Sequence, residues 1–235
     1  MRPRLVPWLA VLTLTAAGAA AAAGYGLTAP KHYRATAQLL VAPVSPGDPT
    51  FAGIGVLRDT GGKKTAAADV AALLHAPQIA DAVAAQLGLK RSRASLQHAL
   101  RTQVVGSSDV VDVTAEDASP SAAAQLANTF ANALITQRTA SFQSDLAAAI
   151  RRDETFLATG QDAAIVRRVT TLRGLQGKPD PTVRLASQAV VPTTAVWPSV
   201  PRLVAIGAGI GAAVCLLVAL LVLGFRRTRR SVSAG

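Results

Sequence analysis

The chain has 235 residues, of which 50% are hydrophobic and 4% aromatic, and its formal net charge is +11 at pH 7. That length accommodates one domain together with anchors. The basic charge suggests nucleic-acid binding, but no run of Lys or Arg is interleaved with aromatic residues, so we exclude that class of partner. The single cysteine, Cys215, excludes a disulfide within the chain, and packing alone must hold the fold.

Residues 5–27 form an uncharged segment that follows Arg2 and Arg4. A cleaved signal peptide also begins with basic residues, and the alanines at 21–23 resemble its small-residue cleavage site. The apolar part of a signal peptide spans only about 7–15 residues, however, whereas this segment stays uncharged for its whole length. We therefore expect an uncleaved transmembrane helix and keep the cleaved signal peptide as the alternative.

Residues 203–225 form a second uncharged run, which at about 1.5 Å per residue spans roughly 34 Å and can cross a hydrocarbon core of about 30 Å. Four arginines follow it: Arg226, Arg227, Arg229 and Arg230. The positive-inside rule then places both termini in the cytoplasm and the chain in the cell membrane. The expected parts are a cytoplasmic N-terminus (1–4), two spans (5–27 and 203–225), an extracytoplasmic domain (28–202) and a cytoplasmic tail (226–235).

The extracytoplasmic domain contains 18 of the 24 basic residues and all 13 acidic ones, which gives it a charge of +5. Anionic glycans or lipid headgroups are therefore its expected partners, although most of these charges also fit an ordinary solvated surface.

Inside the domain the patterns predict an α+β fold with a small mixed sheet and several helices. Residues 31–41 alternate polar and apolar side chains, as a half-buried strand does. The Pro-, Gly- and Ser-rich residues 43–64 predict an exposed loop. Helical spacing and end signals such as the Ser92 cap predict three short helices, at 65–75, 77–87 and 92–101. Two short strands, 103–106 and 109–115, then read as a hairpin.

One long helix dominates the second half of the domain, because Ser119 and Pro120 suit its start and no Gly or Pro interrupts it before Gly160. Its apolar residues form two stripes, one with Leu126, Phe130 and Leu134 and the other with Phe142, Leu146, Ile150 and Leu157. At about 100° per residue, the second stripe is rotated by some 120° from the first. We expect the first half to cover the sheet and the second to pack on the next helix (162–175) or on another subunit.

The last strand, residues 182–190, leads into the proline-rich approach to the second span. Because it and the first strand meet the same bilayer surface, we expect them to pair. Pro192, Pro198 and Pro201 should stiffen this connection, since each fixes φ and removes a donor. Gly207 and Gly211 place small surfaces one turn apart, which allows close helix approach, although glycines are also common in membrane helices generally. Trp8 and Trp197 suit interfacial anchors.

No pattern in the chain predicts catalysis. His32, His75 and His98 lack metal-ligand spacing. Glu116 and Asp117 precede the long helix, where carboxylates favour the positive end of its dipole. Asp153 and Glu154 adjoin two arginines on what should be an exposed turn, and sequence neighbours do not supply the cross-cleft geometry of a glycosidase. We therefore expect a non-enzymatic protein with no catalytic residue, cofactor or metal.

The order of these features resembles the bacterial polysaccharide co-polymerases of the chain length determinant, or Wzz, type. The resemblance rests on YRATAQL at 33–39, on a helix that ends in QLGL at 86–89, on DVVDVTAED at 109–117 followed by an Ala-rich helix with Ala-Asn, and on the prolines and glycines around the second span. It extends over nearly the whole chain. The family's Ser-Pro-Lys before that span stands here as Val200-Pro201-Arg202. No ATP-binding domain follows Arg230, so the chain is similar to the short form whose tyrosine kinase is a separate chain.

The resemblance implies a homo-oligomeric membrane scaffold that regulates chain length, polymerisation or export of an exopolysaccharide, capsule or O-antigen together with its polymerase or export machinery, and that also modulates a separate kinase. The expected membrane-proximal and helix-packing residues are Pro192, Pro198, Pro201, Arg202, Gly207 and Gly211. The topology-setting residues are Arg2, Arg4, Arg226, Arg227, Arg229 and Arg230. The alternative is a single-span surface receptor or binding module with a cleaved signal peptide.

Overall fold

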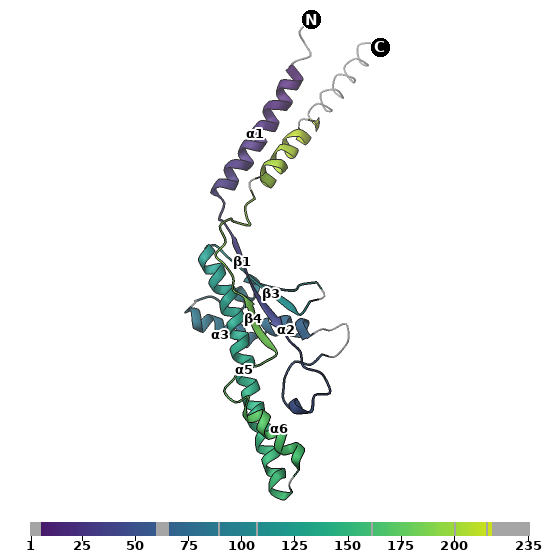
Figure 1. Cartoon of the computed structure of the whole chain (residues 1–235). Coiled ribbons are helices and arrows are strands. Elements are labelled where there is room, and N and C mark those ends of the chain that lie inside the picture. Colours follow the sequence, from purple (N-terminus) through teal and green to yellow (C-terminus); the bar gives the residue numbers. More distant parts are fainter. Residues whose placement is uncertain are drawn as a thin grey trace, which may run out of the picture. The chain divides into compact units, whose positions relative to one another are not determined.

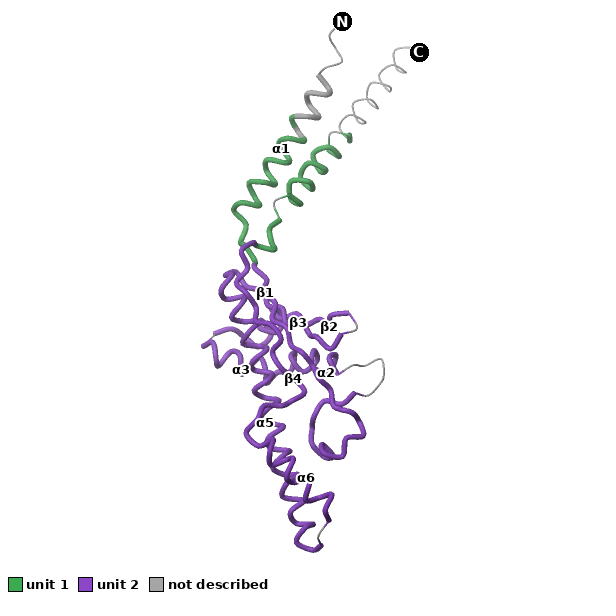
Figure 2. Tube along the Cα trace, viewed as in Figure 1, with its two compact units in different colours: residues 1–32, 195–235 green, residues 33–194 purple. Residues whose placement is uncertain are grey.

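The computed structural model describes residues 6–59, 66–88, 90–106, 108–160, 162–199, 201–214 and 216–217 (Figure 1). The chain divides into two compact units (Figure 2). Met1–His32 and Ala195–Gly235 form the first, here called the helical unit. Tyr33–Thr194 form the second, the α+β unit.

The α+β unit contains a four-stranded sheet in the order β2-β3-β1-β4. Its strands are β1 (Tyr33–Val41), β2 (Leu100–Val104), β3 (Val110–Asp117) and β4 (Val183–Ser187). The expected pairing of the first and last strands is confirmed, with Val41 opposite Val183. The expected mixed sheet is wrong, because every pair of neighbouring strands is antiparallel. A parallel pair would need a crossover on one side of the sheet, whereas β4 returns along β1 in the opposite direction.

One face of the sheet is covered by helices, namely α2 (Ala66–Leu74), α4 (Arg93–Ala99) and the first half of α5 (Pro120–Thr159), and α3 (Pro77–Leu87) packs on α5 and α4. The Ser92 cap is confirmed, since its hydroxyl accepts a hydrogen bond from the Ser95 N–H at 3.2 Å. Gly88 ends α3 in the left-handed conformation, with φ of +60°, which favours glycine. Helix α4 is shorter than expected, because Leu100 already pairs with Ala115 in the sheet.

The larger hydrophobic core, here the sheet core, lies between this sheet face and α5. Alternate residues of β1 and β3, such as Leu39 and Val113, are fully buried in it. Leu126, Phe130 and Leu134 of α5 pack in the same cluster, as the first apolar stripe predicted. Each such side chain stabilises the fold by about 1.5–3 kcal/mol relative to leaving it in water.

The second half of α5 continues beside α6 (Ala163–Arg173), where the two helices enclose a separate distal core (Figure 1). Phe142, Leu146 and Ile150 of α5 contribute the rotated stripe, and Val169 and Leu172 of α6 face them. The expectation that this half packs on the following helix is confirmed.

The segment expected to be an exposed loop, residues 43–64, also contributes to the distal core. Ile54 and Val56 are buried there, near the short 3₁₀ helix η1 (Pro49–Phe51). Three arginines from α5 and α6 donate to backbone carbonyls of this segment: Arg138 to Gly55, Arg152 to Gly53, and Arg168 to Thr50 and Ala52. These bonds satisfy backbone groups that a buried loop would otherwise leave unpaired.

Asp153 was expected on an exposed turn, but its side chain is only 10% exposed and pairs with Arg168 of α6 at 2.7 Å. A second buried pair lies between the two cores, where Arg138 contacts Asp180 at 2.7 Å and the Asp180 side chain is 1% exposed. Asp180 also accepts hydrogen bonds from the N–H and hydroxyl of Thr182, at 2.8 and 2.6 Å. This carboxylate therefore links the middle of α5 to the start of β4.

In the helical unit, α1 (Val6–Thr28) lies against a helix formed by Pro201–Val214. Among the described residues, no single helix has both the length and the apolarity to cross a membrane, although the bent pair of α2 and α3 meets that criterion by length and composition. Residue 5 of the expected first span and residues 215 and 218–225 of the expected second span lie outside the described part of the chain.

Candidate functional site

The two helices of the helical unit approach closely at glycines. A Cβ atom added to Gly207 would lie 2.5 Å from the carbonyl oxygen of Gly18 and 2.6 Å from the Cβ of Ala22. A Cβ added to Gly18 would in turn lie 2.6 Å from the Gly207 carbonyl oxygen and 3.7 Å from the Cα of Gly211. Real Cβ atoms do not approach backbone atoms so closely, so the contact requires glycine on both helices. The sequence singled out Gly207 and Gly211 but not Gly18.

Backbone hydrogen bonds join the two segments that lead into these helices. The His32 N–H donates to the Trp197 carbonyl at 2.9 Å, and the His32 carbonyl accepts from the Val196 N–H at 2.8 Å. Pro198 follows this pairing and is buried, whereas Pro201 and Arg202 are exposed at the start of the helix. Pro192 is half-buried at the end of the α+β unit. The topology-setting arginines at positions 2, 4, 226, 227, 229 and 230 lie outside the described residues.

Asn128 of α5 holds the chain that leaves β4. Its side-chain amide donates to the Ala189 carbonyl at 3.1 Å, and its side-chain oxygen accepts from the Ala189 N–H at 2.8 Å. The side chain thus takes the place of a neighbouring strand for residue 189, just before the proline-rich approach. The Ala-Asn in the long helix was quoted for the family resemblance, but nothing in its spacing predicted this contact.

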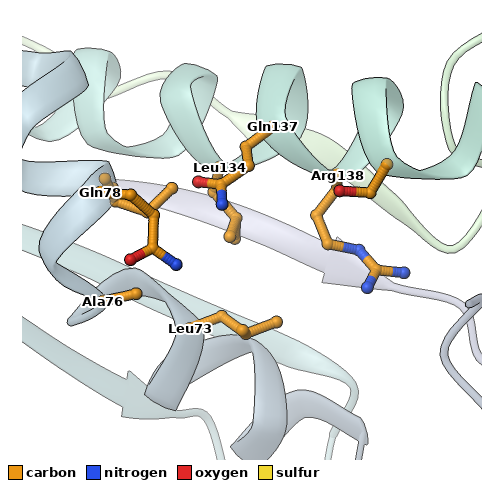
Figure 3. Close-up of a pocket in the computed structure, with 8 residues that line it drawn as sticks. Leu73, Ala76, Gln78, Leu134, Gln137 and Arg138 are labelled. Carbon is orange, nitrogen blue, oxygen red and sulfur yellow. The ribbon is translucent and has the colours of Figure 1, made fainter. Parts of the chain in front are cut away.

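A small cavity of about 110 Å³ lies between α5 and the α2–α3 turn. Leu73, Ala76 and Gln78 line one side, and Leu134, Gln137 and Arg138 of α5 line the other (Figure 3). Pockets for small organic ligands usually measure about 300–1,000 Å³. The cavity therefore has room for a few water molecules and not for a sugar.

The second face of the sheet is polar, and none of its residues belongs to the sheet core. Cross-strand pairs follow the register: Arg34 with Glu116, Thr36 with Thr114 and Gln38 with Asp112. Arg101 and Gln103 of β2 extend these rows beside β3. We call this surface the polar face. A wide depression of about 540 Å³, the arginine pocket, opens at the β2 edge of this face and is lined by Arg34, His75, Arg101, Thr102, Gln103 and Thr114. Arg34, Arg101, Gln103 and Thr114 reach it from the polar face, whereas Thr102, opposite Val113, and its partner His75 reach it from the helix-covered face.

Among the described residues, no group of three or more His, Cys, Asp or Glu side chains is placed to hold a metal ion. His75 instead lies 3.0 Å from the Thr102 hydroxyl, a contact that fixes the end of α2 against β2.

No family model and no curated protein matches the chain. Among solved structures it is similar to a full-length bacterial polysaccharide co-polymerase, with a TM-score of 0.48 and 12% sequence identity, and 98% of each chain is covered.

Proposed function

We propose that this chain is a non-enzymatic membrane scaffold that assembles as a homo-oligomer and regulates chain length, polymerisation or export of a cell-envelope polysaccharide. The observation that carries the proposal is the pairing of the two chain ends. Helix α1 packs on the helix at Pro201–Val214. Strand β1, which follows α1, and strand β4, which precedes the second helix, are neighbours in one sheet. This arrangement fits a single domain held between two membrane helices, as the resemblance to the chain length determinants implies.

In this proposal residues 5–27 and 203–225 cross the membrane, the basic flanks keep both termini in the cytoplasm, and residues 28–202 lie outside. The packing of Gly18 on Gly207 supports an uncleaved first helix, because a removed signal peptide would leave Gly207 without this partner. N-terminal sequencing of the mature protein tests this point. Retention of Arg2 and Arg4 is expected, and a start near Gly24 would instead support the single-span receptor.

The mechanism we propose is positional. The external domains of several subunits, arranged by their membrane helices, set how long a growing glycan stays with its polymerase or export machinery. The tail from Arg226 is the proposed contact for a separate tyrosine kinase. In this mechanism the protein breaks no bond and needs no cofactor.

The direct test is deletion of the gene, followed by measurement of the amount and length distribution of the surface polysaccharide by gel electrophoresis and size-exclusion chromatography. We expect an altered length distribution that the intact gene restores. An unchanged amount and an unchanged distribution would refute the proposal.

A further inference from the structure

Two arginines meet on one carboxylate at the polar face. Arg34 of β1 donates to Oε1 of Glu116 through Nε at 2.9 Å and also through a terminal nitrogen. Arg101 of β2 approaches the same oxygen from the other side of β3, with its Nε at 3.3 Å. The side chains of Arg34 and Arg101 are 41% and 69% exposed. The three side chains together carry a charge of +1 in a position that solvent can reach. The next carboxylate on this face, Asp112 opposite Gln103, accepts a hydrogen bond from Gln38.

Hydrogen-bonding capacity remains at the same place. A guanidinium has five N–H donors, and within the described residues Arg101 contacts only Glu116, as an ion pair through Nε, and donates no hydrogen bond. The side-chain amide of Gln103, which lines the same depression, also has no hydrogen-bond partner among the described residues. At about 540 Å³, the arginine pocket has the volume of a small-ligand site. It thus combines an excess cation, unused donors and room for one or two sugar rings.

We propose that the arginine pocket binds a carboxylate-bearing sugar, such as a uronic acid unit, in the glycan whose length the chain regulates. The inference rests on the proposed function for the source of the glycan. A guanidinium matches a planar carboxylate with two parallel hydrogen bonds. Glu116 already shows that the two arginines accept a carboxylate at this place. The side-chain amide of Gln103 supplies a polar group suited to a sugar hydroxyl, and the Thr114 hydroxyl, which pairs with Thr36, supplies a second.

The pocket favours an acidic sugar over a neutral one because of what lines it. None of its six lining residues is Phe, Tyr or Trp. The imidazole of His75 is the single aromatic ring in the lining, and its Nε2 is already engaged with the Thr102 hydroxyl. Charge must then provide most of the discrimination. The pocket also makes Glu116 a competitor of the ligand, because its carboxylate occupies the donors that the ligand would use. Removing the Glu116 charge should therefore strengthen binding, whereas removing Arg101 should weaken it.

The test uses the full chain in lipid nanodiscs and measures binding of an oligogalacturonate tetramer by microscale thermophoresis. The matched ligand is the same tetramer with its carboxyl groups reduced to alcohols. Arg101→Gln should weaken binding of the acidic tetramer by about fivefold, and Glu116→Gln should strengthen it by a similar factor, as expected for one exposed charge pair. Arg184→Gln is the control, because Arg184 is exposed on β4 opposite Leu40, on the same face but outside the pocket. It should leave the affinity unchanged.

Equal binding of the acidic and the reduced tetramer would overturn the inference, as would equal losses for Arg101→Gln and Arg184→Gln. Inorganic phosphate at equal ionic strength should compete poorly; competition as strong as that of free galacturonate would show a general anion site and overturn the assignment to a sugar acid. The two proposals fail separately. If the tetramer does not bind but gene deletion still alters chain length, only the pocket assignment falls. If it binds and deletion changes nothing, the scaffold function falls.

Discussion

Replacing the side-chain amide nitrogen of Asn128 with an oxygen removes one of the two hydrogen bonds between Asn128 and Ala189. Asn128→Asp keeps the acceptor for the Ala189 N–H but loses the donor to the Ala189 carbonyl, and it places a carboxylate oxygen against that carbonyl. A net hydrogen bond contributes about 1 kcal/mol, and an unsatisfied buried acceptor costs about 1–3 kcal/mol. Ala189 is 7% exposed, so water cannot readily replace the lost donor. We expect a loss of about 2–3 kcal/mol in the free energy of unfolding.

For a unit of this size, 1 kcal/mol corresponds to about 2–4 °C in Tm, so the variant should melt roughly 5–10 °C lower. Circular dichroism of the full chain in detergent measures this shift. Asn132→Asp is the matched control, since it makes the same change one turn further along α5 at an exposed side chain that has no hydrogen bond among the described residues. Its Tm should stay within about 2 °C of the wild type. Equal melting temperatures for the two variants would refute the role given to Asn128.

Three further changes test the cores and the helix contact. Asp180→Asn removes the buried charge partner of the half-buried Arg138 and should cost about 3 kcal/mol in urea unfolding. The same change at Asp81, in an exposed pair, should cost less than about 1 kcal/mol, and similar costs for the two variants would contradict the role of burial. Gly207→Ile should lower the folded chain recovered from membranes, because its Cβ has no room, while Gly209→Ile, whose added Cβ meets nothing within 4 Å, should not; equal recovery would contradict the close helix contact. Leu146→Ala should cost about 2–5 kcal/mol in thermal unfolding by opening a cavity in the distal core, and a loss below 1 kcal/mol would count against that core.

Local periodicity was sufficient for the main elements of the α+β unit. The alternation in residues 31–41 predicts β1, and the two stripes on the long helix predict two different packing surfaces, which the sheet core and the distal core confirm. Both signals arise because one side of an element is buried, and burial leaves a period of 2 in a strand and 3.6 in a helix.

The loop at 43–64 could not be read in this way. Its Pro and Gly content indicates irregular backbone, which is correct, but not where that backbone lies. Ile54 and Val56 are buried because arginines distant in sequence satisfy the surrounding carbonyls. Asp153 was misread for the same reason, since its partner Arg168 lies on another helix. Such pairs leave no local pattern.

The candidate sites also differ in whether a local sequence pattern predicts them. Gly207 and Gly211 follow a local spacing that the sequence displays, and their role in packing between subunits stays a prediction. The arginine pocket depends on strand register, which brings Arg34, Arg101 and Glu116 together from three strands. A shift of one residue in any strand would turn the side chain to the other face and abolish the cluster.

The separation of the sheet core from the distal core has a consequence for how such a domain can change in size. The two cores share α5, but the side chains that fill one do not fill the other. Whole turns could therefore be added to the far part of α5 and matched in α6 without repacking the sheet. Each added turn would extend the helical hairpin by about 5.4 Å. The sheet and the paired ends of the chain could then stay constant while relatives differ in how far the hairpin reaches.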